Sequence, residues 1–453
     1  MAGLHEVEAD VRARLELALG RPVGGLERLP GGASRETWAF NTGGRELILR
    51  RDPPGRLGES GSMRLEAGAI SACASAGLAV PNVVLVDDGD RLGTPGLVMT
   101  RVPGETVARR ILREPALATA RAVLVGQLGS FLAGLHRLGP DAVPGLPDTD
   151  PLAYLGEMYD SVEDTSAIFD AAFRWLERHR PDRSGTTIVH GDFRLGNVIV
   201  GEDGLRAVLD WELVHVGDPL EDLAWLCVKA WRFGARPAAA GVGTIDELLA
   251  AYEAASGRPV DRDAFHWWLV EKTLQWGTIC MKQAAAHLTG SARSVELAAI
   301  GRRVAEQEWD LLELLAPPGS APPRPAAADQ QREPSPGLYG RPTAEELLDA
   351  VEEFLAGPVS ESTEGQVRFH AKVAANVVRI VARQLRAGPA PTDRARRALD
   401  GLGAGSFPEL SAAIRSGKFD DRESELYPVL WALVADRLAV ANPHHTGPAR
   451  EES

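Results

Sequence analysis

A helical period governs the first hydrophobic positions of the chain. Val7, Val11, Leu15 and Leu19 recur every four residues, which would place them on one face of a helix. The period does not continue into the next stretch. The sequence therefore predicts an N-terminal helix within residues 1–24.

Short apolar stretches separated by turn residues replace this period between residues 25 and 102. The pair Gly43-Gly44 is typical of a tight hairpin turn, so we expect Glu36–Phe40 to pair with Glu46–Arg50. One further helical stretch and two further strand-like stretches lie at 62–77, 81–90 and 96–102. The region predicts a small, mostly antiparallel sheet that carries one helix.

A mainly helical pattern follows from residue 103 to residue 316. Its exception is the stretch 186–216, where short apolar runs are broken by loops. Residues 317–340 are rich in proline and lack an apolar period, which is typical of a semi-extended linker. A new helix is predicted after the linker, with Thr343 as its N-cap and Glu346 completing a capping box.

Together these patterns predict an α+β fold that ends in a small all-α domain. Helical periodicity recurs in that domain at 367–386 and 427–440. The predicted segments are an N-terminal helix at 1–24, a sheet-containing region at 25–102, a mainly helical region at 103–316, a proline-rich linker at 317–340 and a helical accessory domain at 341–445.

Composition limits the function without identifying it. The 453 residues are 44% hydrophobic and 25% charged, as in ordinary globular proteins. The net charge of −14 argues against sequence-independent nucleic-acid binding, which needs an excess of Lys and Arg. No apolar run approaches the ~20 residues that span a bilayer, so we expect no membrane association. Cys73, Cys227 and Cys280 resemble small buried hydrophobic residues, which fits a reducing, cytoplasmic location.

The stretch IVHGDFRLGNVIV, residues 188–200, carries the first candidate chemistry. Asp192 and Asn197 lie five positions apart between two strand-like segments. One interpretation is a turn in which both side chains bond their own backbone. The other is a catalytic loop in which one side chain handles a proton and the other holds a metal. The spacing alone does not decide between the two.

Asp210 favours the catalytic interpretation. It follows an apolar strand thirteen residues after Asn197, and two strands around a tight turn can bring such side chains together. Amide and carboxylate oxygens suit Mg²⁺, and a further carboxylate can orient a hydroxyl and accept its proton. In the earlier stretch LPGGAS, small residues at Gly31, Gly32 and Ser34 would let backbone N–H groups approach phosphate oxygens.

Two signatures carry a resemblance to a known family. HGDFRLGN matches the pattern H-G-D-x-x-x-x-N, and DWELVHVGDPLEDLA at 210–224 matches D-x-E-x-x-x-x-G-D-P-x-x-D-L-A. Over residues 25–315 the chain resembles the aminoglycoside phosphotransferase-like branch of the protein-kinase fold. The resemblance implies a bilobal kinase-like fold with an N-lobe at 25–102 and a C-lobe at 103–316. It also implies an enzyme that uses ATP and Mg²⁺ to phosphorylate an alcohol group on a small molecule.

The resemblance also implies roles for individual residues. Asp192 would be the catalytic base or the residue that orients the hydroxyl, and Asn197 and Asp210 would bind Mg²⁺. Residues that would support these loops are His190, Asp218 and Asp222.

Nucleotide-binding positions follow in the same way. Gly31, Gly32 and Ser34 would line the phosphates, and Glu66 would be the acidic partner of the phosphate-binding cation. The backbone of the hinge GLVMTRVPG would receive adenine, through the residues Met99, Arg101 and Val102. One departure concerns the family's strand lysine, which Arg50, or alternatively Arg51, replaces here. Arginine keeps a permanent charge but carries a longer and differently aimed fork, so we interpret it as a substitution rather than a loss.

The amino-acid sequences of both signatures, including their variable positions, are most similar to those of kinase domains linked to acyl-CoA dehydrogenases. That similarity implies a hydroxyacyl-CoA-like acceptor, whereas related branches act on aminoglycosides, choline or macrolides. The segment after the linker resembles an uncharacterised helical domain attached to such kinases. This second resemblance implies no function, and the domain is a candidate surface for a protein partner.

Two other functions stay open from the sequence. One is an antibiotic phosphotransferase acting on an aminoglycoside or a macrolide, and the other is a nucleotide-binding regulatory module without turnover. An aromatic cluster at 265–276 is of the kind that usually packs in a core, although nearby helices shape the acceptor site in this fold. The candidates for the acceptor pocket are Trp267, Trp276 and His287.

Overall fold

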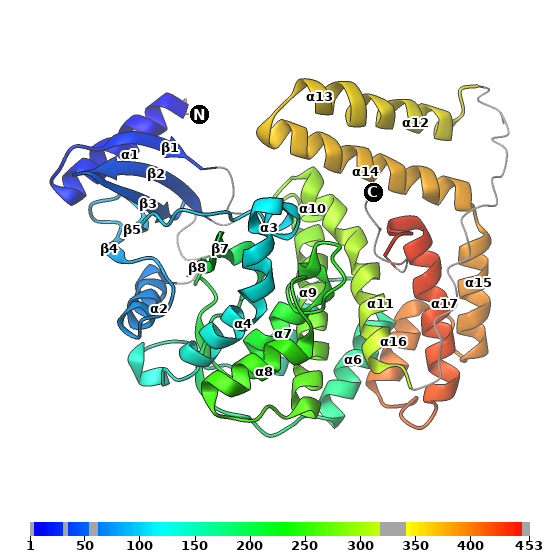
Figure 1. Ribbon diagram of the computed structural model, residues 1–453. Helices are drawn as coiled ribbons and strands as arrows, with labels where there is room; N and C mark the ends of the chain where they lie inside the picture. The colour runs from blue at the N-terminus through cyan, green and yellow to red at the C-terminus, as the bar shows by residue number, and fades with distance from the viewer. Residues whose placement is uncertain (1–3, 30–34, 54–61, 318–340, 446–453) are drawn as a thin grey trace. The chain divides into compact units, whose positions relative to one another are not determined.

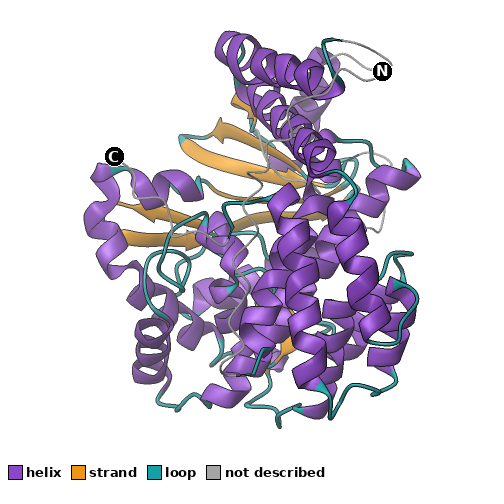
Figure 2. Ribbon diagram, turned by 90° about the vertical axis from the view of Figure 1, so that its right-hand side faces the viewer, coloured by secondary structure: helices purple, strands orange, loops and turns teal. Residues whose placement is uncertain are grey.

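The computed structural model describes residues 4–29, 35–53, 62–317 and 341–445. Two units make up the chain: the first unit joins residues 1–149 to 182–269, and the second unit joins 150–181 to 270–453. Every described strand belongs to the first unit, and the described part of the second unit contains helices and loops. Figure 2 shows the strands in orange and the helices in purple.

A five-stranded sheet forms the beginning of the first unit (Figure 1). Its strands lie in the order β1-β2-β3-β5-β4, and all neighbouring pairs are antiparallel. Their bounds are β1 Gly24–Arg28, β2 Glu36–Thr42, β3 Arg45–Arg51, β4 Val83–Asp88 and β5 Pro95–Thr100. The predicted antiparallel sheet is therefore confirmed.

The hairpin between β2 and β3 fixes their register. Gly43 and Gly44 both have positive φ, 56° and 75°, which is the conformation that a two-residue type I′ turn requires. From this turn the two strands pair without a gap as far as Glu36 opposite Arg51. The predicted pairing of these strands is confirmed.

Alternation along β2 and β3 turns one face of the sheet towards α1 (Leu4–Leu19), the predicted N-terminal helix. The buried residues that these three elements share are Val11, Leu15, Trp38, Phe40, Leu47 and Leu49. Each buried side chain of this size contributes about 1.5–3 kcal/mol of transfer free energy. Helix and sheet therefore stabilise one another.

A second helix, α2 (Met63–Ser75), packs against β4 and β5. It buries Glu66 to 1% exposure, which is rare for a carboxylate unless it is paired. Cys73 lies on the same helix, and burial raises the pKa of its thiol to about 12. Cys227 and Cys280 are likewise buried and unbridged, as the sequence predicted.

The rest of the first unit surrounds the predicted catalytic stretch. Its helices are α3 Ala108–Arg113, α4 Ala118–Leu135, α7 Leu220–Cys227, α8 Ile245–Ser256 and the beginning of α9 Arg262–Thr289. Its short strands are β6 Thr187–Val189, β7 Val198–Gly201, β8 Gly204–Val208 and β9 His215–Gly217. Its 3₁₀ turns are η1 Pro115–Leu117, η2 Pro140–Ala142, η3 Leu195–Asn197 and η4 Lys229–Arg232. Strand β6 pairs with β9, and β7 pairs with β8.

The stretch Pro115–Leu135 is the one helical segment of the described chain that is long and apolar enough, by length and composition, to cross a membrane. The expectation that no such run exists is wrong for this segment. Half of its apolar window is buried, and α4 packs along α8 and β8. This burial is that of a core helix, which passes the same test of length and composition.

Helices from both sides of the linker form the second unit. Before the linker these are α5 Pro151–Asp160, α6 Ala167–Arg178, the end of α9, α10 Val295–Ile300, the 3₁₀ turn η5 Gly301–Arg303 and α11 Val304–Leu315. After it come α12 Ala344–Phe354, the π-helical turn η6 Leu355–Val359, α13 Ser360–Ser362, α14 Gly365–Ala387, α15 Ala390–Gly401, α16 Phe407–Arg415 and α17 Glu423–Ala441. The predicted capping box of Thr343 and Glu346 begins α12. The predicted domain boundaries stay predictions.

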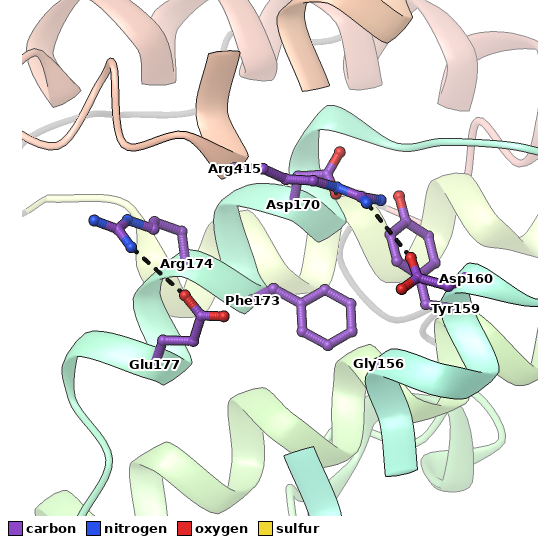
Figure 3. A pocket seen from close by; sticks show the side chains of 8 residues that line it. All are labelled: Gly156, Tyr159, Asp160, Asp170, Phe173, Arg174, Glu177 and Arg415. Atoms are coloured by element: carbon purple, nitrogen blue, oxygen red, sulfur yellow. Dashed lines mark hydrogen bonds and ion pairs between the residues drawn. The ribbon is translucent and has the colours of Figure 1, made fainter. Parts of the chain in front are cut away.

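In the described part of the chain, helices from opposite sides of the linker pack against one another in three pairs, of which one is α10 with α14. Helix α17 packs against α11, where the rings of Trp309 and Trp431 meet edge to face at 4.6 Å. Helix α16 packs against α6, and Arg415 Nε donates to the buried Asp170 at 2.5 Å. Figure 3 shows this last contact beside an open cavity of about 210 Å³, which residues of α5 and α6 line together with Arg415.

Candidate active site

The catalytic stretch runs from the buried strand β6 through a short loop and η3 into β7. Asn197 Nδ2 donates to the Asp192 carboxylate at 2.7 Å and to the Asp192 backbone oxygen at 2.9 Å. The second bond is of the kind that the turn interpretation predicts. The first shows that the loop also holds the acidic side chain in a fixed position. The turn interpretation therefore describes part of the loop, and the catalytic interpretation stays a prediction.

The Asp192 carboxylate has two further donors. Trp225 Nε1 donates to it at 2.7 Å, and Arg194 Nε lies 2.9 and 3.1 Å from its two oxygens. The Asp192 side chain is 15% exposed, so one part of it still faces solvent. A carboxylate held by three side chains is well placed to orient a hydroxyl group.

Gly191 makes the sharp turn before Asp192 possible. Its φ is 82°, and an added Cβ would lie 2.4 Å from the backbone oxygen of Leu213. A side chain at this position would require a backbone shift, so the glycine belongs to the geometry of the loop.

His190 is buried and bonded on both ring nitrogens. Its Nδ1 accepts from the Asp192 N–H at 3.1 Å, so its Nε2 donates to the Leu209 oxygen at 2.9 Å. These bonds tie the catalytic loop to the strand that leads to Asp210. They are the bonds expected of a residue that braces the loop.

Asp222, in the first turn of α7, holds the backbone of the loop through hydrogen bonds. It accepts from the backbone N–H groups of His190 at 2.8 Å and Gly191 at 3.0 Å, and it contacts His136 at 3.3 Å. Burial alone would raise the pKa of Asp222, but the bonds and charges of the histidines and the backbone donors hold it below its ordinary value.

Asp218 supports the loop before β6 rather than the predicted catalytic loop. It accepts from the backbone N–H groups of Ser184 at 2.6 Å and Leu220 at 2.9 Å. Burial raises the pKa of Asp218, and these two donors offset only part of that rise. Asp218 therefore joins the loop before β6 to the start of α7, whereas Asp222 holds the catalytic loop itself.

Asp210 follows β8 in a left-handed conformation, with φ 65°. The Leu209 N–H donates to the Asn197 backbone oxygen at 2.8 Å. This bond brings the backbone just before Asp210 to the end of the predicted catalytic loop. Arg50 Nη2 donates to Asp210 at 2.5 Å. Burial would raise the pKa of Asp210, but the charge and hydrogen bond of Arg50 outweigh it and lower that pKa.

Arg50 also makes the predicted ion pair with Glu66. Its Nη1 donates to Glu66 at 2.6 Å, so the one guanidinium joins Glu66 of α2 to Asp210. Arg51, the alternative candidate, points to the other face of β3 and donates to Glu36 at 2.9 Å. Of the two candidates, Arg50 is therefore the one that pairs with Glu66 and Asp210, and its match to the family's lysine stays a prediction.

Arg35 is a site residue that the sequence did not indicate. Its side chain is 1% exposed, forms an ion pair with Glu66 and donates to Asp52 at 3.2 Å. Its Nε also lies 4.0 Å from Glu212, two residues after Asp210. The only sequence signal was its place directly after the glycine-rich stretch, and its partners lie far from it along the chain.

The other predicted nucleotide positions are less informative. Met99 is buried in β5, opposite Ile48 of β3, and the Arg101 N–H donates to the Glu46 oxygen at 3.0 Å. Val102 follows directly and is partly exposed. The predicted phosphate-lining residues Gly31, Gly32 and Ser34 lie outside the described residues.

The predicted acceptor-pocket residues fall in two different units, and their role stays a prediction. Trp267 is buried in the first unit, edge to face with Trp268, whereas Trp276 and His287 belong to the second unit. Trp225 donates to Asp192, and Trp231 packs on Trp225 with a distance of 5.2 Å between the ring centroids. No local sequence pattern distinguishes these two tryptophans from the other eight.

The donor set beside Asp192 fits Mg²⁺. Asn197 uses its Nδ2 for Asp192, and its Oδ1 has no hydrogen-bond partner in the described chain, although the residue is 6% exposed. Asp210 adds a carboxylate, and together they offer the hard oxygen ligands that Mg²⁺ prefers. Four carboxylates (Asp52, Glu66, Asp210 and Glu212) surround the two guanidiniums, which leaves a formal excess of two negative charges. No group of three or more His, Cys, Asp or Glu among the described residues offers another metal site.

Comparison with known proteins agrees with this geometry. The phosphotransferase enzyme family matches residues 25–268, and a domain of unknown function matches residues 361–445. Acyl-CoA dehydrogenase family member 10 from Mus musculus is 28% identical over 313 residues, which cover 62% of this chain and 28% of that protein. Viomycin phosphotransferase from Streptomyces vinaceus is 28% identical over 156 residues, which cover 31% of this chain and 53% of that protein. The chain therefore spans only part of the length of these relatives.

A solved structure shows the fold. The crystal structure of a candidate aminoglycoside phosphotransferase from Ralstonia eutropha JMP134 has a TM-score of 0.53 at 22% identity. The alignment covers 67% of this chain and 98% of that one. The predicted kinase-like α+β fold with a helical C-terminal region is confirmed.

Proposed function

Because the chain belongs to the phosphotransferase enzyme family, we propose that it transfers the γ-phosphoryl group of ATP to a hydroxyl group of a small molecule, with Mg²⁺ as cofactor. The observation that carries the proposal is a chain of contacts: Asn197 holds Asp192, the residue before Asp210 bonds the Asn197 backbone, and Arg50 joins Asp210 to Glu66. Neither a structural turn nor an ordinary surface cluster requires all of these contacts at once.

Each residue has a definite part in this reaction. Asp192 orients the acceptor hydroxyl and takes its proton as the oxygen–phosphorus bond forms and the bond to the ADP oxygen breaks. Arg50 keeps its charge at any working pH: burial would lower its pKa, but Glu66 and Asp210 raise it. Asn197 and Asp210 would hold Mg²⁺, which supplies neutralisation of the phosphate oxygens when it is bound.

For the acceptor we propose a hydroxyacyl-CoA-like thioester. The support is the wording of the two signatures and the relative named acyl-CoA dehydrogenase family member 10, since a domain joined to such an enzyme would meet acyl thioesters. The similarity to viomycin phosphotransferase favours an antibiotic acceptor as the second candidate. A regulatory module without turnover is the third, and the intact set Asp192, Asn197 and Asp210 speaks against it.

A panel of acceptors tests the proposal. The full chain is incubated with Mg·ATP and, separately, with hydroxyacyl-CoA thioesters, aminoglycosides and macrolides, and the products are weighed by mass spectrometry. We expect one added phosphate on the hydroxyacyl-CoA thioesters only. Phosphate on an antibiotic instead would replace the proposed acceptor, and no transfer to any class together with no ADP release would favour the regulatory module.

The variant Asp192→Asn tests the catalytic assignment. Loss of a general base costs about 10²–10⁴-fold in rate, so turnover should fall at least 10²-fold while ATP still stabilises the protein against heat. ADP release and thermal unfolding with nucleotide measure the two effects. Glu202→Gln, at an exposed position after β7, is the matched control and should keep full activity. Full activity in Asp192→Asn would refute the role of this carboxylate.

A further inference from the structure

Two short segments of the first unit are strongly basic, and we name them together the basic rim. They are helix α3 (Ala108–Arg113) and residues 228–243. Their cations are Arg109, Arg110, Arg113, Lys229, Arg232 and Arg236. Neither segment contains an acidic residue, although the chain as a whole carries a net charge of −14. Such a local excess of positive charge attracts anions.

The basic rim begins beside the catalytic loop. Trp231 lies in its second segment and packs on Trp225, whose indole N–H donates to Asp192. The guanidinium of Arg194, which also donates to Asp192, lies 4.9 Å from the centre of the Trp231 ring. An acceptor with its hydroxyl at Asp192 can therefore extend over Arg194 and Trp231 towards residues 228–243.

The backbone of 228–243 is fixed in an unusual shape. Phe233 and Ala240 have φ of 50° and 53°, a left-handed conformation that costs non-glycine residues about 1 kcal/mol or more each. The Ala240 N–H donates to the end of α7, and a Cβ on Gly241 would lie 3.2 Å from the side chain of Leu112 in α3. The two segments of the basic rim therefore lie against each other at Leu112 and Gly241.

The charges of the basic rim are engaged to different degrees. Arg110 lies 3.4 Å from Glu105 and 3.8 Å from Glu114, so its charge is partly balanced. Arg232 donates to a backbone oxygen through Nη2, while its buried Nε has no partner in the described part of the chain. Arg109 is exposed and forms no ion pair or hydrogen bond with any described residue. The exposed Arg109 therefore offers the rim's most accessible guanidinium to a ligand, whereas the Arg232 Nε is buried.

We propose that the basic rim binds the phosphorylated nucleotide of a coenzyme A thioester while the acyl hydroxyl lies at Asp192. Guanidinium groups match phosphate oxygens in pairs, and several along one surface suit a ligand that carries several phosphates. The same charges repel polycations, so the rim also selects against aminoglycosides. This inference rests on the proposed function, because it takes the hydroxyl transfer at Asp192 as given.

Binding of coenzyme A itself tests the inference without turnover. The variant Arg109→Glu/Arg236→Glu reverses two exposed charges of the rim, and Arg45→Glu, exposed at the hairpin end of β3, is the matched control. Calorimetry on the full chain measures the Kd for coenzyme A and, separately, for pantetheine, which lacks the nucleotide. We expect the double variant to raise the Kd for coenzyme A at least about tenfold, which corresponds to two lost charge contacts. The Kd for pantetheine, the KM for ATP and the control variant should stay unchanged.

Three results would overturn the inference. They are no binding of coenzyme A to the wild type, an unchanged Kd for coenzyme A in the double variant, and a double variant that raises the KM for ATP instead of the Kd for coenzyme A. A rim that binds coenzyme A in this way, in a protein that phosphorylates no hydroxyacyl-CoA, would support the inference and refute only the proposed acceptor. The two failures are thus distinguishable.

Discussion

Glu66 shows how this chain uses an arginine at the position where the sequence resemblance implies a lysine. The fork of Arg50 spans two carboxylates, Glu66 through Nη1 and Asp210 through Nη2. A lysine ammonium is a compact point charge without such a fork. Arg35 occupies the other oxygen of Glu66, so two guanidiniums fix this buried carboxylate. A second arginine, Arg35, therefore accompanies Arg50 at this carboxylate.

Replacing Arg35 tests this arrangement. Arg35→Gln leaves Asp52 without its arginine and Glu66 with only one, and breaking a buried ion pair from one side costs about 3–5 kcal/mol. We expect urea unfolding to show this loss of unfolding free energy. We also expect a raised KM for ATP, because Arg50 is then drawn more strongly to Glu66. Arg35→Lys should restore part of both.

The control for this prediction is Arg28→Gln. Arg28 pairs with Glu36 at 3.3 Å in the same sheet, but its side chain is 47% exposed, so the change should stay below about 1 kcal/mol. An Arg35→Gln protein as stable as the Arg28→Gln protein would show that the two buried ion pairs of Arg35 contribute nothing.

The residues of the site divide clearly into those that the sequence could predict and those that it could not. Asp192, Asn197 and Asp210 lie at short, fixed spacings within one stretch, so a motif identifies them. Arg35 and Trp231 join the site only through folding, Arg35 by reaching Glu66 on another helix and Trp231 by packing on Trp225. No local pattern distinguishes them from other arginines and tryptophans of the chain.

The catalytic loop, as an element, depends on Gly191. Gly191→Ala places a Cβ 2.4 Å from the Leu213 oxygen at a φ of 82°, so the loop must shift. We expect a loss of at least about 2 kcal/mol in unfolding free energy and a lower kcat, because Asp192 moves with its neighbour. Gly185→Ala, where the new Cβ would lie 3.6 Å from Pro219, should change neither. Equal behaviour of the two variants would refute the strain argument.

The support of the loop by Asp222 predicts a dependence on pH. The folded-state pKa of Asp222 lies below its ordinary value of 3.8, so its stabilising effect is present above that value and is lost as the pH falls towards the folded-state pKa. Asp222→Asn cannot accept from both backbone N–H groups and should cost about 2 kcal/mol at pH 7. Urea unfolding at several pH values should show this difference shrinking in acid, and a difference that grows instead would contradict the assignment.

The sheet and the hairpin were predictable, whereas the grouping of the helices was not. Alternation and glycine turns are local signals, and they sufficed for β2 and β3. Local sequence signals predicted α12, α14 and α17 but not α15 or α16, and they do not say which partner covers each apolar face. In the structure, α16 and α17 pack against α6 and α11, which lie far upstream in the chain. Such pairings depend on shape and buried charge rather than on period.

At the level of the whole chain, the residues after the linker complete a buried polar face of α11. Three of its acidic residues find partners in α17 or just beyond it: Glu306 bonds Asn442 at 2.9 Å, Glu308 bonds Arg437 at 2.5 Å and Asp310 bonds His445 at 2.7 Å. Glu308 is fully buried, and burial raises its pKa although Arg437 lowers it in part. The C-terminal segment therefore stabilises a helix on the other side of the linker.

A double-mutant cycle tests this dependence. Arg437→Ala leaves Glu308 buried with only Ser166 as its donor, so we expect a loss of about 3 kcal/mol, at the low end for buried pairs because Arg437 is 47% exposed. Glu308→Gln removes the buried charge, and in the Arg437→Ala background it should recover part of that loss. Thermal and urea unfolding of the full chain measure all four proteins. The control is Arg394→Ala. It breaks the more exposed ion pair between Arg394 of α15 and Asp436, which lies on α17 beside Arg437, and it should cost less than about 1 kcal/mol. If Arg437→Ala cost no more than this control, or if Glu308→Gln made it worse, α17 would not be held to α11 by this ion pair.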